Sequence, residues 1–305
     1  MTFVVTVPTA ELADALDPVP EGVRVEVWDA DGPAPAQRLD IVVPPYMKQK
    51  AFLASLADLD VGFVQGQAIG YEGVEDLLPP GIRFANASTV HEASTAELAV
   101  ALVLAAQRQI DLFAVNGRQG VWAPVFADSL ADRRVLVLGY GGVGKAIAAR
   151  LEPFEVELVP VASRAREEDG VPVHGVDELQ ALLPTADIVV ASLPGGDQTR
   201  HLLGEEQLAA LPDGALVVNV GRGPLIDTDA LVREVERGRL RAALDVTDPE
   251  PLPQDHPLWT LPGVLIAPHV GGASTAMKPR MVALLRRQIA HLLAGEEPEN
   301  IVIGG

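Results

Sequence analysis

The chain contains no cysteine, which excludes disulfide bonds and thiolate chemistry. It does not open with a basic segment followed by an apolar stretch, so we read residues 3–7 as a first strand and not as part of a signal peptide. The longest apolar stretch, residues 98–106, is too short to cross a bilayer. From these absences we expect a cytoplasmic protein.

Positive charge is also scarce. The 23 lysines and arginines face 42 aspartates and glutamates, and the formal net charge is −19. Such a field repels nucleic acids and anionic membranes, so we expect neither as a partner. It repels an anionic cofactor or substrate as well. Any site for an anion must therefore concentrate its own arginines and N–H donors, which makes the arginines beside glycine turns the first candidates.

The motifs of several enzyme classes are missing. The sequence has no G-x-S-x-G motif, no P-loop and no metal-ligand spacing, so hydrolase chemistry is poorly supported and we expect no metal. Internal repeats and low-complexity segments are absent too. What remains is a chain of 305 residues, 48% of them hydrophobic, in which short apolar runs alternate with helical patterns. This alternation predicts parallel sheets with helical crossovers.

The predicted elements fall into two series. A capping box at residues 94–97 opens a helix, predicted over 95–113, that links them. Strands are predicted near 3–7, 23–27, 41–43 and 61–64, and then near 135–138, 157–162, 187–191, 215–219, 241–245 and 264–267. Helices are predicted over 47–57, 72–78, 143–151, 177–182, 205–210, 228–237 and 276–294, the last one ending at Gly295.

A glycine-rich turn is the most informative motif. The apolar run 135–138 ends in G-x-G-x-x-G and passes directly into a helical pattern, which is the context of dinucleotide binding. Gly139 permits the tight turn, Gly141 lets the backbone approach a pyrophosphate, and Gly144 lets the helix pack on the strand. The anion would lie on free N–H groups at the helix N-terminus. The cofactor contacts predicted around this turn include Tyr140, Gly142 and Val143.

These patterns predict an α/β fold with two doubly wound parallel sheets. Residues 99–274 form a Rossmann nucleotide-binding domain, because six strands with crossovers complete that unit. Residues 1–98 and 275–305 form a flavodoxin-like substrate domain, to which the last helix returns. The chain length agrees with two domains.

The second strand of the nucleotide-binding domain indicates the cofactor. NAD-binding domains carry an acidic residue about 20 positions after the glycine motif, where it holds the ribose hydroxyls. Here Ser163, Arg164 and Arg166 follow that strand instead. An arginine binds a 2′-phosphate bidentately. We therefore predict that NADP(H) is preferred, with NAD(H) also possible, although two solvated surface arginines would give the same pattern.

Three further strands end in residues that suit chemistry on an anion. Arg222 stands between two glycines, where its planar fork suits a carboxylate. Asp245 ends the next strand, and the prolines on both sides of Glu250 restrict its backbone. His269 alone among the six histidines follows an apolar strand and precedes a Gly-Gly turn. Histidine exchanges protons near neutral pH, and Glu250 is its expected partner.

Each of these residues also has an interpretation without a catalytic role. Arg222 could be a turn arginine in a surface ion pair, and Asp245 and Glu250 could be loop acids of an acidic protein. Asp248 is assigned to solvent. The remaining histidines are expected to be structural: His91, His174, His201, His256 and His291.

Taken in order, these motifs resemble the D-isomer-specific 2-hydroxyacid dehydrogenases over nearly the whole chain. The resemblance rests on N-V-G-R-G-P-L-I-D at 219–227, on L-D-V-x-x-x-E-P-L-P at 244–253 with D-H-P-L-W after it, and on A-P-H-V-G-G at 267–272. It also includes Q-A-I-G-Y-E at 67–72 and A-S-L-P at 191–194.

The resemblance implies a role for each residue. Arg222 would bind the substrate carboxylate and polarise its keto oxygen, His269 would pass a proton to or from the C2 oxygen, and Glu250 would orient and charge His269. Asp245 would contact the nicotinamide amide. Leu193, Pro194 and Val220 are further expected cofactor contacts. The substrate would meet Gln67, Ala68, Ile69 and Gly70 of the first domain, and residues 44–47 are expected to line its pocket.

The expected activity is therefore hydride transfer between NADP(H) and a small 2-keto or 2-hydroxy acid such as glyoxylate or hydroxypyruvate. Family members usually form homodimers through the nucleotide-binding domain. Glu250 argues against formate dehydrogenases, which have glutamine there, and Ile69 stands where phosphite dehydrogenases have lysine. The absence of residues after Gly305 makes an added regulatory domain unexpected. An NAD-linked phosphoglycerate-type dehydrogenase and a non-catalytic nicotinamide-binding regulator remain alternatives.

Overall fold

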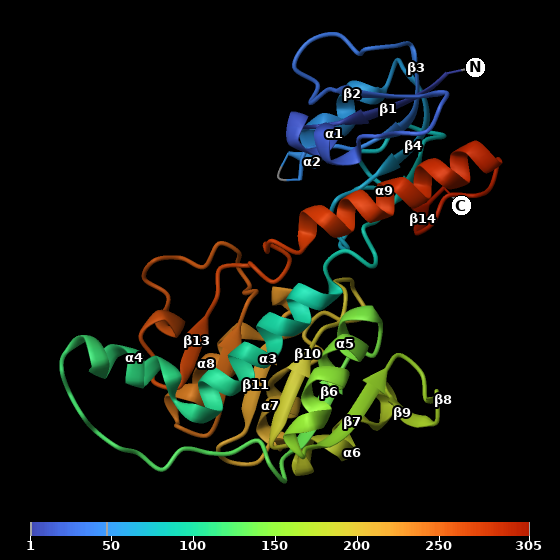
Figure 1. Cartoon of the computed structure of the whole chain (residues 1–305). Coiled ribbons are helices and arrows are strands. Elements are labelled where there is room, and N and C mark those ends of the chain that lie inside the picture. Colours follow the sequence, from blue (N-terminus) through green and yellow to red (C-terminus); the bar gives the residue numbers. More distant parts are fainter. Residues whose placement is uncertain (1, 47, 305) are drawn as a thin grey trace. The chain divides into compact units, whose positions relative to one another are not determined.

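The computed structural model describes residues 2–46 and 48–304. The chain divides into two compact units, Met1–His91 with Ser274–Gly305, and Glu92–Ala273. Each unit contains one sheet, and Figure 1 shows the course of the chain through both. The first boundary coincides with the start of helix α3 (Glu92–Arg108), several residues before the predicted boundary after residue 98, because the whole helix belongs to the second unit.

The first unit is a six-stranded sheet in the order β14-β5-β4-β3-β1-β2. Strands β1 to β5 are parallel, and β14 pairs antiparallel with β5. The order 2-1-3-4-5 is the flavodoxin-like one, which confirms that part of the prediction. The elements are β1 (Phe3–Val7), α1 (Ala10–Leu16), β2 (Val23–Val27), β3 (Arg38–Val42), α2 (Gln49–Leu53), β4 (Asp60–Gln65), β5 (Arg83–Ala85), α9 (Met277–Ala294) and β14 (Ile301–Ile303), with a 3₁₀ turn at Ala54–Leu56.

Alternate side chains of β1 point to opposite faces of this sheet. Val5 and Val7 are fully buried against helices α1 and α9 on one face. Val4 packs in a second core on the other face, which includes the side chains of α2. A parallel sheet needs apolar layers on both faces, and these two cores provide them. The C-terminal helix therefore belongs to the core of the first unit, and it ends at Gly295 in the left-handed conformation (φ 68°).

The second unit is an eight-stranded sheet in the order β13-β12-β11-β10-β6-β7-β9-β8. All neighbours are parallel except β8 and β9, and the order confirms the doubly wound nucleotide-binding fold. The elements are α3, α4 (Ile110–Arg118), β6 (Arg134–Leu138), α5 (Gly142–Leu151), β7 (Glu157–Ala162), β8 (Arg166–Glu168), β9 (Val171–Gly175), α6 (Leu179–Leu182), β10 (Ile188–Ala191), α7 (Glu205–Ala210), β11 (Leu216–Asn219), α8 (Thr228–Glu236), β12 (Arg241–Leu244) and β13 (Val264–Ile266), with 3₁₀ turns at Glu152–Phe154, Val176–Glu178, Leu183–Thr185, Gly223–Leu225 and Pro257–Trp259.

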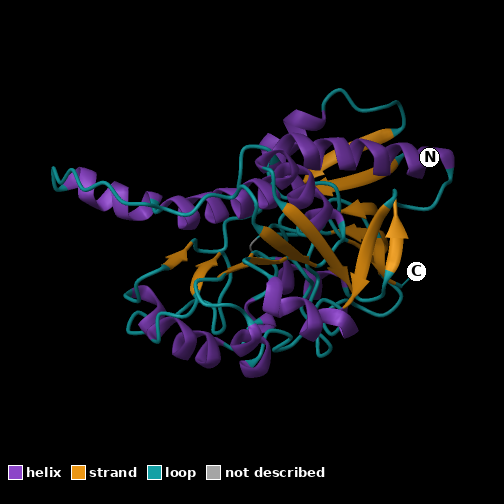
Figure 2. Ribbon diagram, turned by 90° about the horizontal axis from the view of Figure 1, so that it is seen from below, coloured by secondary structure: helices purple, strands orange, loops and turns teal. Residues whose placement is uncertain are grey.

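Helices cover both faces of this sheet (Figures 1 and 2). Val135 and Val137 of β6 pack against α3 and α5, whereas Leu136 and Leu138 pack in a separate core with α6, α7 and α8. This double burial explains why the strands read as continuous apolar runs in the sequence.

Several sequence predictions of local structure were wrong. Residues 72–78 form successive turns and no helix. The helix predicted over 95–113 is two helices, α3 and α4, because Gln109 between them is left-handed (φ 54°). The short strands β5, β8, β9 and β14 and the helix α1 were not predicted. Among the described residues, no single helix is long and apolar enough to span a bilayer. Helices α3 and α4 reach that length and composition only as a pair, with a bend of 68°.

Candidate active site

The sequence-predicted catalytic residues follow adjacent parallel strands of the second unit. Asn219, the last residue of β11, is in register with Leu244 at the end of β12, and Leu244 is in register with Ile266 at the end of β13. The segments after these strands therefore start at one edge of the sheet. In open α/β sheets, ligands bind beyond this carboxyl edge.

His269 and Glu250 are brought together across nineteen positions of sequence. The imidazole Nδ1 lies 2.5 Å from the Glu250 Oε1, and both side chains are about half exposed, at 49% and 42%. Because Glu250 occupies Nδ1, the other ring nitrogen, Nε2, is the one that can exchange a proton with a ligand. The predicted pairing is thus present in the structure.

The turn that carries His269 is held by Asp245. Its carboxylate accepts the N–H of Val270 (2.7 Å) on one oxygen and the N–H of Gly271 (2.9 Å) on the other, and its carbonyl accepts the N–H of His269 (2.8 Å). Asp245 is 3% exposed. The side chain therefore fixes the left-handed turn at His269 (φ 53°). This is a positioning role that the sequence did not reveal, while the expected contact with the nicotinamide amide stays a prediction.

The loop that carries Arg222 is fixed by close backbone packing. A Cβ on Gly221 would lie 2.5 Å from the Leu193 carbonyl oxygen, and one on Gly223 would lie 1.9 Å from the Thr247 carbonyl oxygen, so only glycine fits at either position. The buried Asn219 accepts the N–H of Gly221 (3.0 Å) and donates to the Arg222 carbonyl (2.8 Å). Asn219 is thus a further positioning residue that sequence reasoning missed.

The glycine-rich turn has the geometry that a pyrophosphate needs. Gly139 is left-handed (φ 101°), and a Cβ on Gly144 would lie 1.8 Å from the Gly139 carbonyl oxygen, which explains both glycines. Gly141 and Gly142 are exposed at the start of α5, next to the half-exposed Tyr140 and Val143, and a Cβ on Gly141 would meet nothing within 4 Å. Open space thus lies at Gly141, at the N-terminus of a helix whose first N–H groups have no partner within the helix. These residues fit a dinucleotide.

The other predicted cofactor residues surround the same edge. Leu193 and the exposed Pro194 follow β10, whose last residue Ala191 is in register with Leu138 and with Asn219. Val220 is 6% exposed, and its N–H bonds to the Ala191 carbonyl (2.9 Å). The loops after β6, β10 and β11 are therefore neighbours, as a dinucleotide site on this fold requires.

The arginines after β7 differ in their surroundings. Ser163 and Arg164 are exposed, and no hydrogen bond or ion pair of Arg164 occurs within the described part of the chain. Arg166 is engaged. Its Nε and Nη2 donate to one carboxylate oxygen of Glu168 (2.9 and 2.7 Å), and its Nη2 also donates to the Tyr140 carbonyl (3.2 Å). Lys145 contacts the other oxygen of Glu168. Lys145, and then Arg166, hold the pKa of Glu168 below its usual value.

In the first unit, the predicted substrate loop, residues 67–70, leaves three of its backbone N–H groups without a partner among the described residues. The carbonyl of Gln67 lies 2.6 Å from the Nε2 of the buried His91, the Ala68 carbonyl accepts the Ala87 N–H, and the Ile69 carbonyl accepts the Asn86 side chain. The N–H groups of Ala68, Ile69 and Gly70 donate to none of the other described residues. Successive free N–H groups form a concavity that suits an anion.

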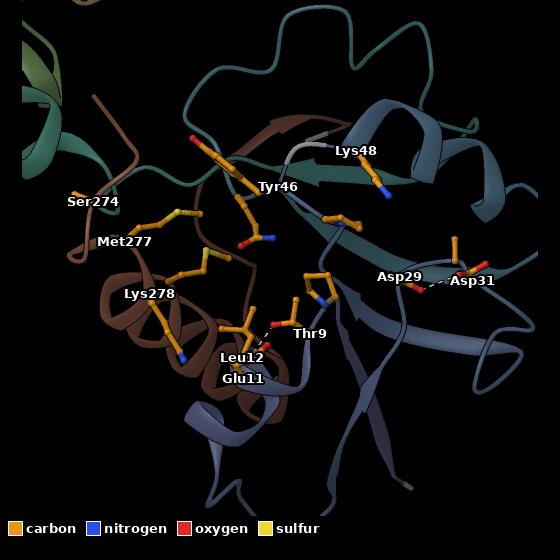
Figure 3. A pocket seen from close by; sticks show the side chains of 15 residues that line it. Thr9, Glu11, Leu12, Asp29, Asp31, Tyr46, Lys48, Ser274, Met277 and Lys278 are labelled. Carbon is orange, nitrogen blue, oxygen red and sulfur yellow. Dashed lines mark hydrogen bonds between the residues drawn. The ribbon is translucent and has the colours of Figure 1, made fainter. Parts of the chain in front are cut away.

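The same unit contains a cavity of about 700 Å³. Its lining includes Gln67, Pro45, Tyr46 and Met277, and Figure 3 shows Leu12 beside Thr9, with Lys48 and Asp31 farther along. Two of the residues expected to shape the substrate pocket, Pro45 and Tyr46, thus line a cavity. Pro44 is buried and accepts the Gln67 side chain (2.9 Å), and Met47 lies outside the described residues.

The residues assigned to structural roles all have partners. His91 contacts Gln67, His174 contacts Glu178, and His201 lies 3.9 Å from Asp227. His256 caps the 3₁₀ turn at 257–259, and His291 contacts the Glu297 carbonyl. Asp248, assigned to solvent, is half-buried and lies 3.6 Å from the Arg200 guanidinium. The residues that the structure describes contain no group of three or more His, Asp or Glu side chains that could hold a metal.

Comparison with known proteins gives consistent matches. Residues 100–271 match the family model for the NAD-binding domain of D-isomer specific 2-hydroxyacid dehydrogenases. The chain is 32% identical to a glyoxylate reductase from Thermofilum pendens, covering 77% of this chain and 73% of that protein. It is 33% identical to glyoxylate/hydroxypyruvate reductase B from Yersinia pestis, covering 77% and 75%.

Solved structures agree over the full length. A D-isomer specific 2-hydroxyacid dehydrogenase from Xanthobacter autotrophicus, in complex with NADPH and MES, matches with a TM-score of 0.82 and 27% identity, covering 99% of this chain and 98% of that one. A family protein from Aeromonas salmonicida has the same fold, with a TM-score of 0.87, 24% identity, and coverage of 100% and 99%.

Proposed function

The chain belongs to the D-isomer specific 2-hydroxyacid dehydrogenase family, and from that premise we propose that it reduces a small 2-keto acid at the expense of NADPH. The observation that carries this proposal is the contact of 2.5 Å between His269 and Glu250 at the carboxyl edge of a nucleotide-binding sheet. A protein that only binds a nicotinamide cofactor has no need for that pair.

The chain's own residues supply the proton and the positive charge that the reduction of the keto acid needs. When bound, the nicotinamide supplies the hydride that adds to C2 of the keto acid. The C2 oxygen then needs a proton and a positive charge nearby. His269 donates the proton from Nε2, because Nδ1 is held by Glu250. General acid catalysis of this kind contributes about 10²–10⁴-fold.

Arg222 provides the positive charge. Its guanidinium can bind a carboxylate bidentately and polarise the keto oxygen. The two glycines beside it and the clamp by Asn219 hold its backbone in place. We further propose that the N–H groups of Ala68, Ile69 and Gly70 hold the substrate carboxylate, since they donate to none of the other described residues.

The proposed preference for NADPH rests on Arg164 and Arg166 after β7 and on Lys145 of α5. Arg164 is exposed, and Arg166 and Lys145 lie beside the glycine-rich turn. An acidic residue at position 164 would repel a 2′-phosphate, whereas an arginine binds it. The NADPH complex of the Xanthobacter relative supports this choice. Glyoxylate and hydroxypyruvate are the proposed substrates because the curated relatives are named for them.

The test is a comparison of cofactor oxidation with glyoxylate, hydroxypyruvate, pyruvate and bulkier 2-keto acids, with NADPH and NADH in parallel. We expect turnover with the small acids and a higher kcat/KM with NADPH. Faster turnover with NADH would remove the cofactor preference, and no turnover with any 2-keto acid would remove the activity.

We also propose that the protein is a homodimer formed through the second unit. Helix α4 buries none of its residues, and it and the following segment expose large apolar side chains, among them Trp122 (96% exposed) and the fully exposed Phe126. Figure 1 shows this segment at the margin of its unit. Large exposed apolar side chains gathered in one segment are typical of a subunit interface. Light scattering of the wild type and of Phe126→Asp tests this, with a dimer expected only for the wild type. A monomeric wild type would contradict it.

A further inference from the structure

Glu168 contacts Arg166, a cation of the predicted 2′-phosphate site, and the neighbouring Lys145. It ends strand β8, and its two oxygens contact two different cations. Oε1 contacts Lys145 of helix α5, and Oε2 accepts both Nε (2.9 Å) and Nη2 (2.7 Å) of Arg166. All three side chains are partly exposed. A single carboxylate therefore satisfies both positively charged groups.

The position of this cluster ties it to the cofactor. Arg166 Nη2 also donates to the Tyr140 carbonyl inside the glycine-rich turn (3.2 Å), and the Lys145 N–H bonds to the Gly141 carbonyl (2.9 Å). On the other side, β8 pairs antiparallel with β9, and β9 pairs with the end of β7 at Ala162. The cluster thus lies between the glycine-rich turn and the strand end where this fold binds the adenosine ribose.

We propose that Glu168 is a specificity-determining residue that occupies the place of the 2′-phosphate and so limits the preference for NADPH. This inference rests on the proposed use of a nicotinamide dinucleotide. The carboxylate and a 2′-phosphate compete for the same donors, because Lys145 and Arg166 cannot form their shortest contacts with both. NAD(H) brings no phosphate and leaves the carboxylate where it is. Glu168 therefore weakens NADP(H) binding and leaves NAD(H) binding unchanged.

The measurement uses ligands that differ only in the phosphate. Adenosine 2′,5′-bisphosphate and adenosine 5′-monophosphate are titrated calorimetrically into the full chain and into Glu168→Gln. Exposed ion pairs contribute up to about 1 kcal/mol, which is about fivefold in affinity. We expect Glu168→Gln to bind the bisphosphate about three- to fivefold more tightly, with the monophosphate affinity unchanged. The gain should shrink as salt is raised, because the competing contacts are exposed.

Glu167→Gln is the matched control. It removes the same charge one residue away, from an exposed side chain that contacts neither Lys145 nor Arg166 within the described residues. An equal gain in this control would mean that only the general negative field matters and would overturn the proposal. A loss of bisphosphate affinity in Glu168→Gln would show that Glu168 holds Arg166 ready for the phosphate, and an unchanged affinity would show no role. A loss of affinity and an unchanged affinity in Glu168→Gln would each overturn the proposal.

The test includes two further measurements, one in a Lys145→Ala background and one of folding. Lys145→Ala should lower bisphosphate affinity, and in that background Glu168→Gln should give a smaller gain, because one of the two released cations is gone. Circular dichroism of each variant checks that the β8–β9 hairpin and its sheet remain folded, and Glu168→Ala replaces the glutamine variant if it does not fold. The titrations need no turnover. A failure of the proposed enzymatic activity would leave the affinity ratio measurable, so the two failures can be told apart.

Discussion

Replacing Asp245 by alanine removes the two hydrogen bonds that hold the His269 turn. The carboxylate accepts Val270 N–H at 2.7 Å and Gly271 N–H at 2.9 Å. Hydrogen bonds to a charged group contribute about 1.5–3 kcal/mol each, so the pair could contribute about 3–6 kcal/mol. Val270 is 38% exposed, so its N–H can bond to water in the variant, whereas Gly271 is buried. We therefore expect a loss of about 2–4 kcal/mol in the free energy of unfolding.

The same variant should also lose activity, because His269 is carried by this turn. A misplacement of about 1 Å can reduce a rate by about 10², and we expect Asp245→Ala to lower kcat by about 10- to 100-fold. Urea unfolding and steady-state kinetics with NADPH and glyoxylate measure the two effects. Asp248→Ala is the matched control, since Asp248 follows the same strand but does not bond to the turn, and it should change stability by less than about 0.5 kcal/mol.

Two outcomes would refute the reasoning. Wild-type stability and wild-type kcat in Asp245→Ala would show that the turn does not depend on this carboxylate. Wild-type stability with a raised KM for NADPH would assign Asp245 to the cofactor and not to the turn.

Four further predictions follow from the same geometry. Gly141→Ala should fold normally, because its Cβ enters open space, yet it should bind NADPH more weakly in a fluorescence titration, because the pyrophosphate is expected to lie in that space. Gly144→Ala should be destabilised in thermal unfolding, because its Cβ would meet the Gly139 carbonyl oxygen at 1.8 Å. Equal stability of the two variants would contradict this. Arg222→Ala should raise the KM for glyoxylate and lower kcat, and an unchanged KM would count against carboxylate binding. Hydrogen bonds from Gly175 N–H and then from the neighbouring histidine lower the pKa of Glu178, so its stabilisation is present at neutral pH and lost as the pH falls through that lowered pKa. Glu178→Gln should therefore unfold more easily than wild type at pH 7 but equally easily near pH 2, and a constant difference would exclude the charge as the cause.

The sequence was sufficient for the doubly wound architecture because its strands are buried on both faces and read as continuous apolar runs, as in β6, β10 and β11. Shorter strands carried no such signal. Strand β8 is the charged segment Arg-Glu-Glu, and it is a strand because it pairs with β9. The predicted helix over 72–78 failed because local composition cannot show that successive turns fill that segment.

The candidate catalytic residues could be predicted from the sequence, but the residues that hold them in position could not. Arg222, Glu250 and His269 stand beside glycines and prolines at strand ends, which is visible in the sequence. The roles of Asn219 and Asp245 depend on hydrogen bonds to loops that only the fold brings near. Two glycines beside Arg222 signalled a turn, but the backbone atoms that exclude a side chain there belong to other loops.

The central claim is that His269, held by Glu250, gives the proton to the C2 oxygen. A single-turnover measurement tests it most directly, with NADPH and saturating glyoxylate mixed with wild type or His269→Ala and the loss of reduced cofactor followed by absorbance. The account predicts that the variant binds NADPH as the wild type does, yet oxidises it about 10²–10⁴-fold more slowly. Oxidation at the wild-type rate by folded His269→Ala would contradict the account.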